Sequence, residues 1–123
     1  MDMADHLQTQ VGSKHTFTIS DSSRRLVFVS DAFCRMTGYT REECVNRNCN
    51  FLQGPETSRE TVNFMRRELV MGNGVDCEIL NYKKDGTPFT NFLVIEPVKA
   101  SSGTVLYFVG VQLDLSSAPE DAK

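Results

Sequence analysis

Residues 75–115 read VDCEILNYKKDGTPFTNFLVIEPVKASSGTVLYFVGVQLDL, and this stretch predicts three β-strands in succession. Apolar and polar side chains alternate along much of it, as they do in strands with one buried face. Asp85-Gly86 and Ser101-Ser102-Gly103 are typical turn residues. Because such short turns join neighbouring antiparallel strands, the stretch predicts a three-stranded meander. Its strands are expected over residues 75–82, 87–98 and 104–115.

The residues before this meander predict two more strands and several short helices. Residues that favour strands occupy 16–20 and 26–30, with the turn residues Asp21-Ser22-Ser23 between them. Strands at both ends and helices between them predict an α+β fold, a five-stranded antiparallel sheet with short helices packed on one face. Ser30 or Asp31 can cap a first short helix that ends at Gly38. Thr40-Arg41-Glu42-Glu43 has the spacing of a capping box for a second. Thr57-Ser58-Arg59-Glu60 has the same spacing and opens a longer helix to about Met71.

The composition is that of one small domain. The chain has 123 residues, 24% of them charged, and a net charge of −3. It therefore lacks the basic surface that nucleic acid or anionic lipid requires. No apolar run approaches the roughly 20 residues that cross a bilayer, so we expect no membrane span and a cytoplasmic protein. We expect the domain over 14–115, with a flexible leader over 1–13 and a disordered tail over 116–123.

Cysteine and histidine usage argues against several kinds of site. The two histidines, His6 and His15, lie near the N-terminus and give no support for a zinc site or a cysteine–histidine hydrolase. A reducing compartment would keep the cysteines as thiols, so we expect neither a disulfide framework nor a metal centre. None of the four cysteines forms a Cys-x-x-Cys pair: Cys34, Cys44, Cys49 and Cys77.

Three amide side chains fall on the predicted inner face of the sheet. Asn81, Asn91 and Gln112 each fall on the same face of their strand as apolar neighbours that should be buried. A buried amide without partners costs about 1–3 kcal/mol. Either the amides satisfy one another or bind water, or they bind a ligand with a planar edge of donors and acceptors. Gly110, inside the last strand, would let a flat ring approach the backbone.

Two further residues allow both a structural and a functional interpretation. Arg66 lies one turn after Val62, on the apolar side of the long helix. It either extends its charge to water or binds an anionic part of a ligand. Cys49 lies in the segment Asn48-Cys49-Asn50-Phe51-Leu52-Gln53-Gly54. It is either an inert core thiol or part of a pocket wall.

Four motifs together resemble those of the light-oxygen-voltage (LOV) family of blue-light photoreceptors, a branch of the PAS fold. The likeness covers about residues 15–114, nearly all of the expected domain, and the phototropin-type members are the most similar in character. The motifs are residues 48–57 around Cys49, Phe33-x-x-Met36-Thr37-Gly38-Tyr39, Asn81-Tyr82-x-Lys84-x-Gly86, and Phe108-Val109-Gly110-Val111-Gln112-Leu113-Asp114.

This resemblance implies a flavin, normally FMN, held between the helices and the sheet. Cys49 matches the thiol that forms a reversible adduct with flavin C4a in blue light. Asn48 and Gln53 would contact the ribityl chain and ring, and Gln112 would face N5. The other cofactor-binding positions that follow are Arg66 for the phosphate, Asn81 and Asn91 for the pyrimidine edge, and Leu93, Ile95, Phe108 and Gly110 along the ring.

One departure from the family pattern concerns the phosphate. Asn50 stands where the family usually has a phosphate-binding Arg. The loss of one charge-assisted contact predicts weaker FMN retention or a larger share of riboflavin. Arg47, Arg59 and Arg67 are the candidates for compensation.

The sequence therefore predicts a photosensory domain that is not an enzyme in the sense of turning over a substrate. The alternative is a light-insensitive PAS-type module for ligand binding or dimerisation. A thiol- or flavin-dependent enzyme is disfavoured because no base accompanies Cys49 in its motif. The expected partners are the flavin, a second copy of the chain in a homodimer, and an effector domain if the chain belongs to a larger receptor.

Overall fold

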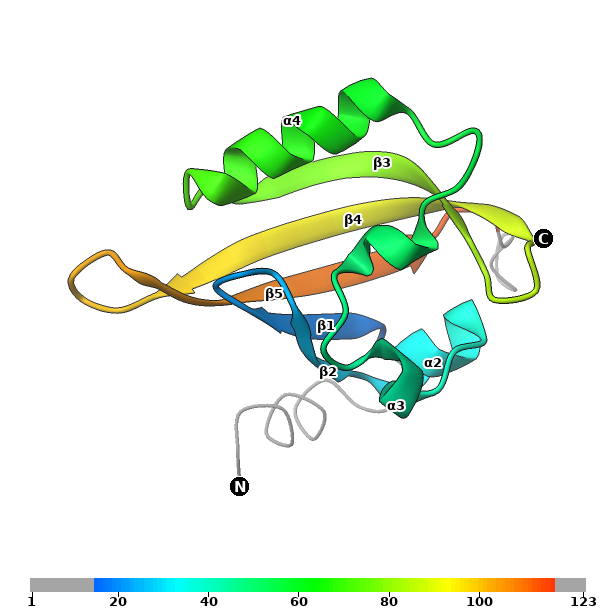
Figure 1. Ribbon diagram of the computed structural model, residues 1–123, viewed down its shortest axis with the longest axis horizontal. Coiled ribbons are helices and arrows are strands. Elements are labelled where there is room, and N and C mark those ends of the chain that lie inside the picture. The colour runs from blue at the N-terminus through cyan, green and yellow to red at the C-terminus, as the bar shows by residue number, and fades with distance from the viewer. Residues whose placement is uncertain (1–14, 117–123) are drawn as a thin grey trace.

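The computed structural model describes residues 15–116, which form an antiparallel sheet with short helices (Figure 1). The order in the sheet is β2-β1-β5-β4-β3. The predicted five-stranded sheet is confirmed, and no predicted strand end is more than one residue from the observed end. The strands are β1 (Phe17–Asp21), β2 (Leu26–Val29), β3 (Val75–Tyr82), β4 (Pro88–Lys99) and β5 (Val105–Asp114).

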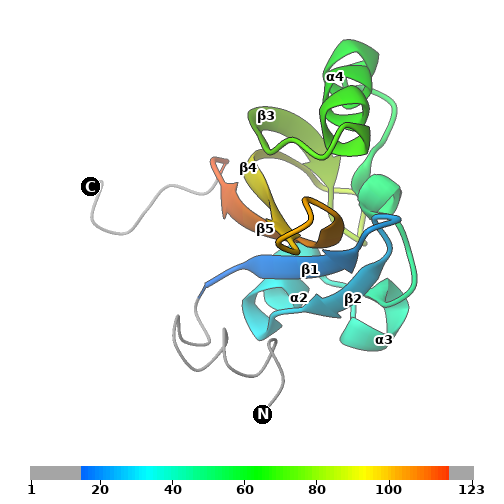
Figure 2. The same ribbon diagram turned by 90° about the vertical axis from the view of Figure 1, so that its left-hand side faces the viewer.

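The helices connect β2 to β3 and cover one face of the sheet. Figure 2 shows α4, the 3₁₀ turn η1 and α3 on the same side of the strands. The Ser30 hydroxyl caps α2 by accepting a hydrogen bond from Phe33 N, and Gly38 ends α2 with a φ of 83°. The predicted capping box between Thr40 and Glu43 is present in α3. The bounds are α2 (Asp31–Thr37), α3 (Arg41–Cys44), η1 (Cys49–Leu52) and α4 (Arg59–Val70).

The capping box predicted at Thr57 is wrong. Ser58 is the N-cap of α4, and its hydroxyl accepts a hydrogen bond from Thr61 N. The Thr57 side chain is buried and is used elsewhere. It donates to Leu80 O at 2.7 Å and accepts from Gly54 N at 3.0 Å, so it joins the segment before α4 to β3. The tertiary contact outweighs the local capping preference because it satisfies the carbonyl of Leu80 on β3.

Strand register brings the inward polar residues together. Residues directly opposite one another on neighbouring strands share a face. Gly110 lies opposite Thr18 of β1 and Ile95 of β4, while the next inward residue, Gln112, lies opposite Leu93. The pairing of β3 with β4 adds Ile79 opposite Asn91 and Asn81 opposite Phe89.

The core divides into two apolar clusters. The first joins β2 to α2, α3 and η1. The second joins Leu69 of α4 to Val75 and Phe108 of the sheet. The cavity described below lies between η1, α4 and the sheet. The first cluster is built from Leu26, Val29, Phe33, Cys44 and Leu52.

The predicted leader (1–13) and all but the first residue of the predicted tail lie outside the described residues. Ser116, which the sequence assigns to the tail, is bound to the sheet. Its hydroxyl accepts a hydrogen bond from Thr90 N at 2.8 Å, and Leu115 N donates to Thr90 O. The described part of the chain therefore includes the first residue of the predicted tail, bound to β4.

Candidate functional site

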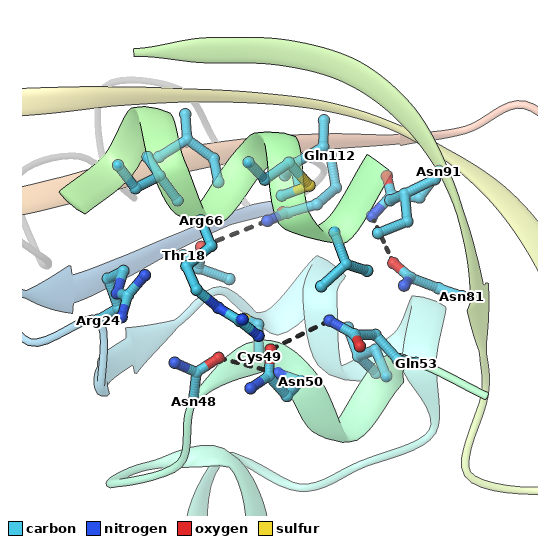
Figure 3. Close-up of a pocket in the computed structure, with 17 residues that line it drawn as sticks. Thr18, Arg24, Asn48, Cys49, Asn50, Gln53, Arg66, Asn81, Asn91 and Gln112 are labelled. Carbon is cyan, nitrogen blue, oxygen red and sulfur yellow. Dashed lines mark hydrogen bonds between the residues drawn. The ribbon is translucent and has the colours of Figure 1, made fainter. Parts of the chain in front are cut away.

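A cavity separates the helices from the inner face of the sheet (Figure 3). The volume that the centres of water molecules could occupy in it is about 140 Å³. A single water needs only roughly 10–15 Å³ on the same measure, so the cavity has room for a larger ligand. Apolar side chains of α4 face apolar side chains of β3 and β4 across it, which suits a flat ring. The predicted site residues that line it are Asn48, Cys49, Gln53, Arg66, Asn81, Asn91, Leu93, Ile95 and Gln112.

Cys49 is the first residue of η1, and the sequence around it fixes that turn. Asn48 is its N-cap, and the Asn48 Oδ1 atom accepts a hydrogen bond from Asn50 N at 3.1 Å. Gln53 closes the turn through its backbone N–H to Asn50 O and through its side-chain amide to Asn50 Oδ1. These local bonds hold the Cys49 thiol in the cavity wall.

The Cys49 thiol is held in its neutral form. Burial raises its pKa to about 12, and the nearby Cys44 thiol adds to the shift. Part of the residue remains accessible, and Cys49 is one of the residues lining the cavity. No hydrogen bond to Cys49 Sγ comes from any residue in the described range, 15–116. The thiol is therefore a proton-bearing group and not a permanent thiolate nucleophile.

This protonation state predicts alkaline destabilisation. Burial also raises the pKa of Cys44, to about 11. Between pH 9.0 and about 12 these thiols ionise in the unfolded chain before they do in the folded chain. The unfolded state then binds fewer protons, so the free energy of unfolding falls as pH rises through this range. Urea unfolding on both sides of pH 9.0 checks it, and Cys49→Ala should give a shallower fall.

The amides on the inner face satisfy one another only in part. Asn91 Nδ2 donates to Asn81 Oδ1 at 3.0 Å, and Gln112 Nε2 donates to Thr18 Oγ1 at 3.3 Å (Figure 3). Asn91 Oδ1 and Gln112 Oε1 are buried and have no partner among the described residues. Two unsatisfied oxygens at about 1–3 kcal/mol each favour a ligand that donates hydrogen bonds to them.

Two predicted site residues, Phe108 and Gly110, are not part of the cavity lining. Phe108 packs in the second apolar cluster, because α4 covers it. Gly110 lies behind two polar side chains: a Cβ there would be 2.8 Å from Thr18 Oγ1 and 3.3 Å from Gln112 Nε2. Its small size thus makes room for the Thr18–Gln112 pair.

Two polar lining residues were not identified from sequence. Thr18 lies between the buried residues Phe17 and Ile19, and its hydroxyl binds Gln112. Arg24 comes from the β1–β2 connection and reaches the same cavity as Arg66. Thr18 could have been found from Gly110, since a strand glycine opposite a polar residue indicates a close approach. Arg24 has no comparable signal in the chain.

Other kinds of site find no support in the part of the chain that the structure describes. Residues 15–116 contain no group of three or more His, Cys, Asp or Glu side chains placed to hold a metal ion. None of the helices described is long and apolar enough to cross a membrane.

Comparison with known proteins identifies relatives over nearly the whole chain. The model of the PAS domain family matches residues 14–117. Phototropin-1A of Oryza sativa subsp. japonica is 42% identical over 89% of this chain, which covers 12% of that protein. Blue-light-activated histidine kinase 1 of Erythrobacter litoralis is 39% identical over 89% of this chain, which covers 31% of that protein. The chain thus spans less than a third of each.

Solved structures show the same relationship. The LOV domain of an Erythrobacter litoralis blue-light activated histidine kinase has a TM-score of 0.79 and 37% identity, over 84% of this chain and 97% of that one. The light-state structure of the Aureochrome1 LOV photoreceptor has a TM-score of 0.80 and 33% identity, over 98% of this chain and 92% of that one.

Proposed function

The chain belongs to the PAS domain family, in its light-oxygen-voltage (LOV) branch, and from this we propose that it is a blue-light receptor domain that binds a flavin. The observation that carries the proposal is that Cys49, Asn91 and Gln112 line the same cavity. A neutral thiol and two unsatisfied amide oxygens meet there. The names of the relatives favour this function over a light-insensitive PAS module.

The polar groups fit the edges of a flavin. Its pyrimidine edge carries one N–H donor between two carbonyl acceptors, and Asn81 and Asn91 offer both complementary kinds of group. The unsatisfied Asn91 Oδ1 suits the donor. Val62, Met65 and Leu69 of α4 would cover one face of the ring, and Leu93 and Ile95 of the sheet the other.

The chain supplies position and a proton, and the flavin supplies the photochemistry. A bound flavin would supply the light-driven reactivity of its ring, while Cys49 would supply the sulfur and the proton of its thiol and would take both back in darkness. No outside oxidant or reductant is required. Cys49 needs no neighbouring base, because a thiol held against the reacting atom gains its rate from proximity.

Gln112 is the group that we propose carries the signal into the sheet. Its amide can rotate to exchange a donated hydrogen bond for an accepted one. In the structure Nε2 is bound weakly to Thr18, and Oε1 is free to accept from a newly protonated atom. Its neighbours on β5, Val111 and Leu113, are exposed on the opposite face of the sheet. A rotation in the cavity could thus change the outer surface.

Replacement of Gln112 by leucine tests that role. Leucine keeps the size but can neither donate nor accept, so the photochemical step should persist while the response of the sheet is blunted. Light-minus-dark infrared spectra in the amide region measure the response, and flavin absorption measures the step. Amide-region difference signals that are as large in Gln112→Leu as in the native protein would contradict the role.

A direct test of the function uses the native protein. Purified or flavin-reconstituted protein should be yellow, lose its blue absorption band under blue light, and regain it in darkness. Protein that remains colourless after reconstitution, or stays yellow under intense blue light, would refute the proposal.

The cofactor and partners can be proposed more finely. We propose FMN as the resident flavin, with riboflavin as the competing occupant because Asn50 provides no cation. The domain is proposed to sense light and to turn over no substrate. Since the relatives are longer, an effector in a larger receptor is proposed as its output. A homodimer stays a prediction, for which Tyr107, Val111 and Leu113 offer exposed apolar surface.

A further inference from the structure

The β1–β2 connection holds an arginine in an unusual backbone conformation. Arg24 has a φ of 69°, in the left-handed region where glycine or asparagine is normally found. Asp21 stabilises the turn: its carbonyl accepts from Arg24 N at 2.8 Å, and its carboxylate accepts from Ser23 N and Arg25 N. A long cationic side chain at such a position points to a use for that side chain.

This turn is joined to the segment that carries the reactive thiol. Arg25 forms an isolated β-bridge with Asn48, and Leu26 N donates to Arg47 O at 2.8 Å. The backbone at Arg24 is therefore fixed relative to η1. Figure 3 shows Arg24, Asn48 and Arg66 on the side of the cavity away from Asn81 and Asn91.

The charges of Arg24 and Arg66 are not neutralised within the described residues. Neither guanidinium has an ion pair with a carboxylate in the range 15–116. No Asp or Glu lines the cavity that both of them line. Two unpaired guanidinium groups at one end of a cavity form a binding site for an anion, and their forked donors match a phosphate.

The arginines that the sequence suggested as substitutes are not placed for this role. None of Arg47, Arg59 and Arg67 lines the cavity. Arg47 instead lies over the ring of Phe51, with its guanidinium carbon 5.2 Å from the ring centroid. Among the described residues, the cations that line the cavity are thus Arg24 and Arg66.

We propose that Arg24 binds the phosphate of a flavin mononucleotide together with Arg66, and so replaces the cation that Asn50 cannot supply. This inference rests on the proposed function, because it assumes a flavin in the cavity. It assigns specificity to a residue of the β1–β2 turn: Arg24 selects the phosphate monoester over the uncharged riboflavin.

The test compares matched variants of the flavin-free protein. Arg24→Gln removes the charge in the cavity, while Arg25→Gln removes one from the exposed neighbour that does not line it. FMN and riboflavin are titrated separately, with flavin fluorescence as the readout. Arg24→Gln should raise the Kd for FMN by about 10–100-fold, the range for a hydrogen bond to a charged group, and leave the Kd for riboflavin unchanged. Arg25→Gln should change neither.

A second variant separates binding from folding. Arg24→Gly removes the side chain at a backbone conformation that glycine adopts without strain. Its thermal unfolding midpoint should equal or exceed the native value, while its preference for FMN over riboflavin falls as in Arg24→Gln. Added salt should reduce the preference of the native protein more than that of either variant.

The outcomes are distinct. An unchanged FMN preference in Arg24→Gln and Arg24→Gly, or an equal loss for both flavins, overturns the role of Arg24 while a reversible light response leaves the photoreceptor function standing. If Arg25→Gln raises the Kd for FMN as much as Arg24→Gln does, the overall charge of the protein sets the affinity, and the role of Arg24 is overturned. A native protein that binds neither flavin refutes the proposed function, and this inference with it.

Discussion

Replacing Cys49 by alanine is expected to abolish the light-induced loss of flavin absorption and to leave the flavin bound. Cys49 lines the cavity, and its thiol is neutral and half-buried. The groups expected to hold the flavin come from other positions, most of them on α4, β3, β4 and β5. Alanine removes the sulfur and leaves these other groups unchanged. Absorption spectra before, during and after blue illumination measure the effect, which should be complete.

Cys77→Ala is the matched control. Cys77 is also half-buried and lies opposite Leu93 in the sheet, but it does not line the cavity. This variant should bleach and recover as the native protein does. Full bleaching and recovery in Cys49→Ala would remove Cys49 from the photochemistry, whatever the control does.

Replacing Gly54 by alanine is expected to give a large loss of stability. A Cβ at this position would overlap ring carbons Cδ1 and Cε1 of Tyr82 and lie 2.9 Å from Cζ. Moving the ring would also break the bond from Glu56 N to the Tyr82 hydroxyl. Overpacking of this kind costs about 1–3 kcal/mol of unfolding free energy. Because Gly54 follows Gln53 of the cavity wall, flavin content should fall as well.

Urea unfolding of three variants separates the causes. Tyr82→Phe removes only the hydroxyl and should cost less than Gly54→Ala. Tyr82→Ala removes the ring, so adding Gly54→Ala to it should cost little. If Gly54→Ala costs as much without the ring as with it, the clash is not the cause.

The sheet could be predicted from the sequence because alternation and turns act locally. Val75–Tyr82 was predicted with its observed bounds, since Asp85-Gly86 sets the hairpin that follows it. The buried amides were predicted for the same reason: Asn81, Asn91 and Gln112 break a periodic apolar pattern. A residue that contradicts its own local pattern is visible without a structure.

Other features depend on contacts between distant segments and could not be predicted. Thr57 was expected to cap α4, but it binds the carbonyl of Leu80. Phe108 was expected along the ring, and in the structure it packs against Leu69 of α4 outside the lining of the cavity. Arg24 reaches the cavity only because the β1–β2 turn takes a left-handed residue and is bridged to Asn48. Each of these outcomes depends on three-dimensional pairing rather than on local preference.

The proposed photochemistry requires that the Cys49 thiol is protonated in darkness and is consumed reversibly by light. Infrared spectroscopy of the S–H stretching region observes that thiol directly, with Cys49→Ala to identify its band. The native protein is expected to lose this one band under blue light and to regain it in darkness, in step with the flavin absorption. Bleaching of the flavin with the Cys49 band unchanged would contradict the account.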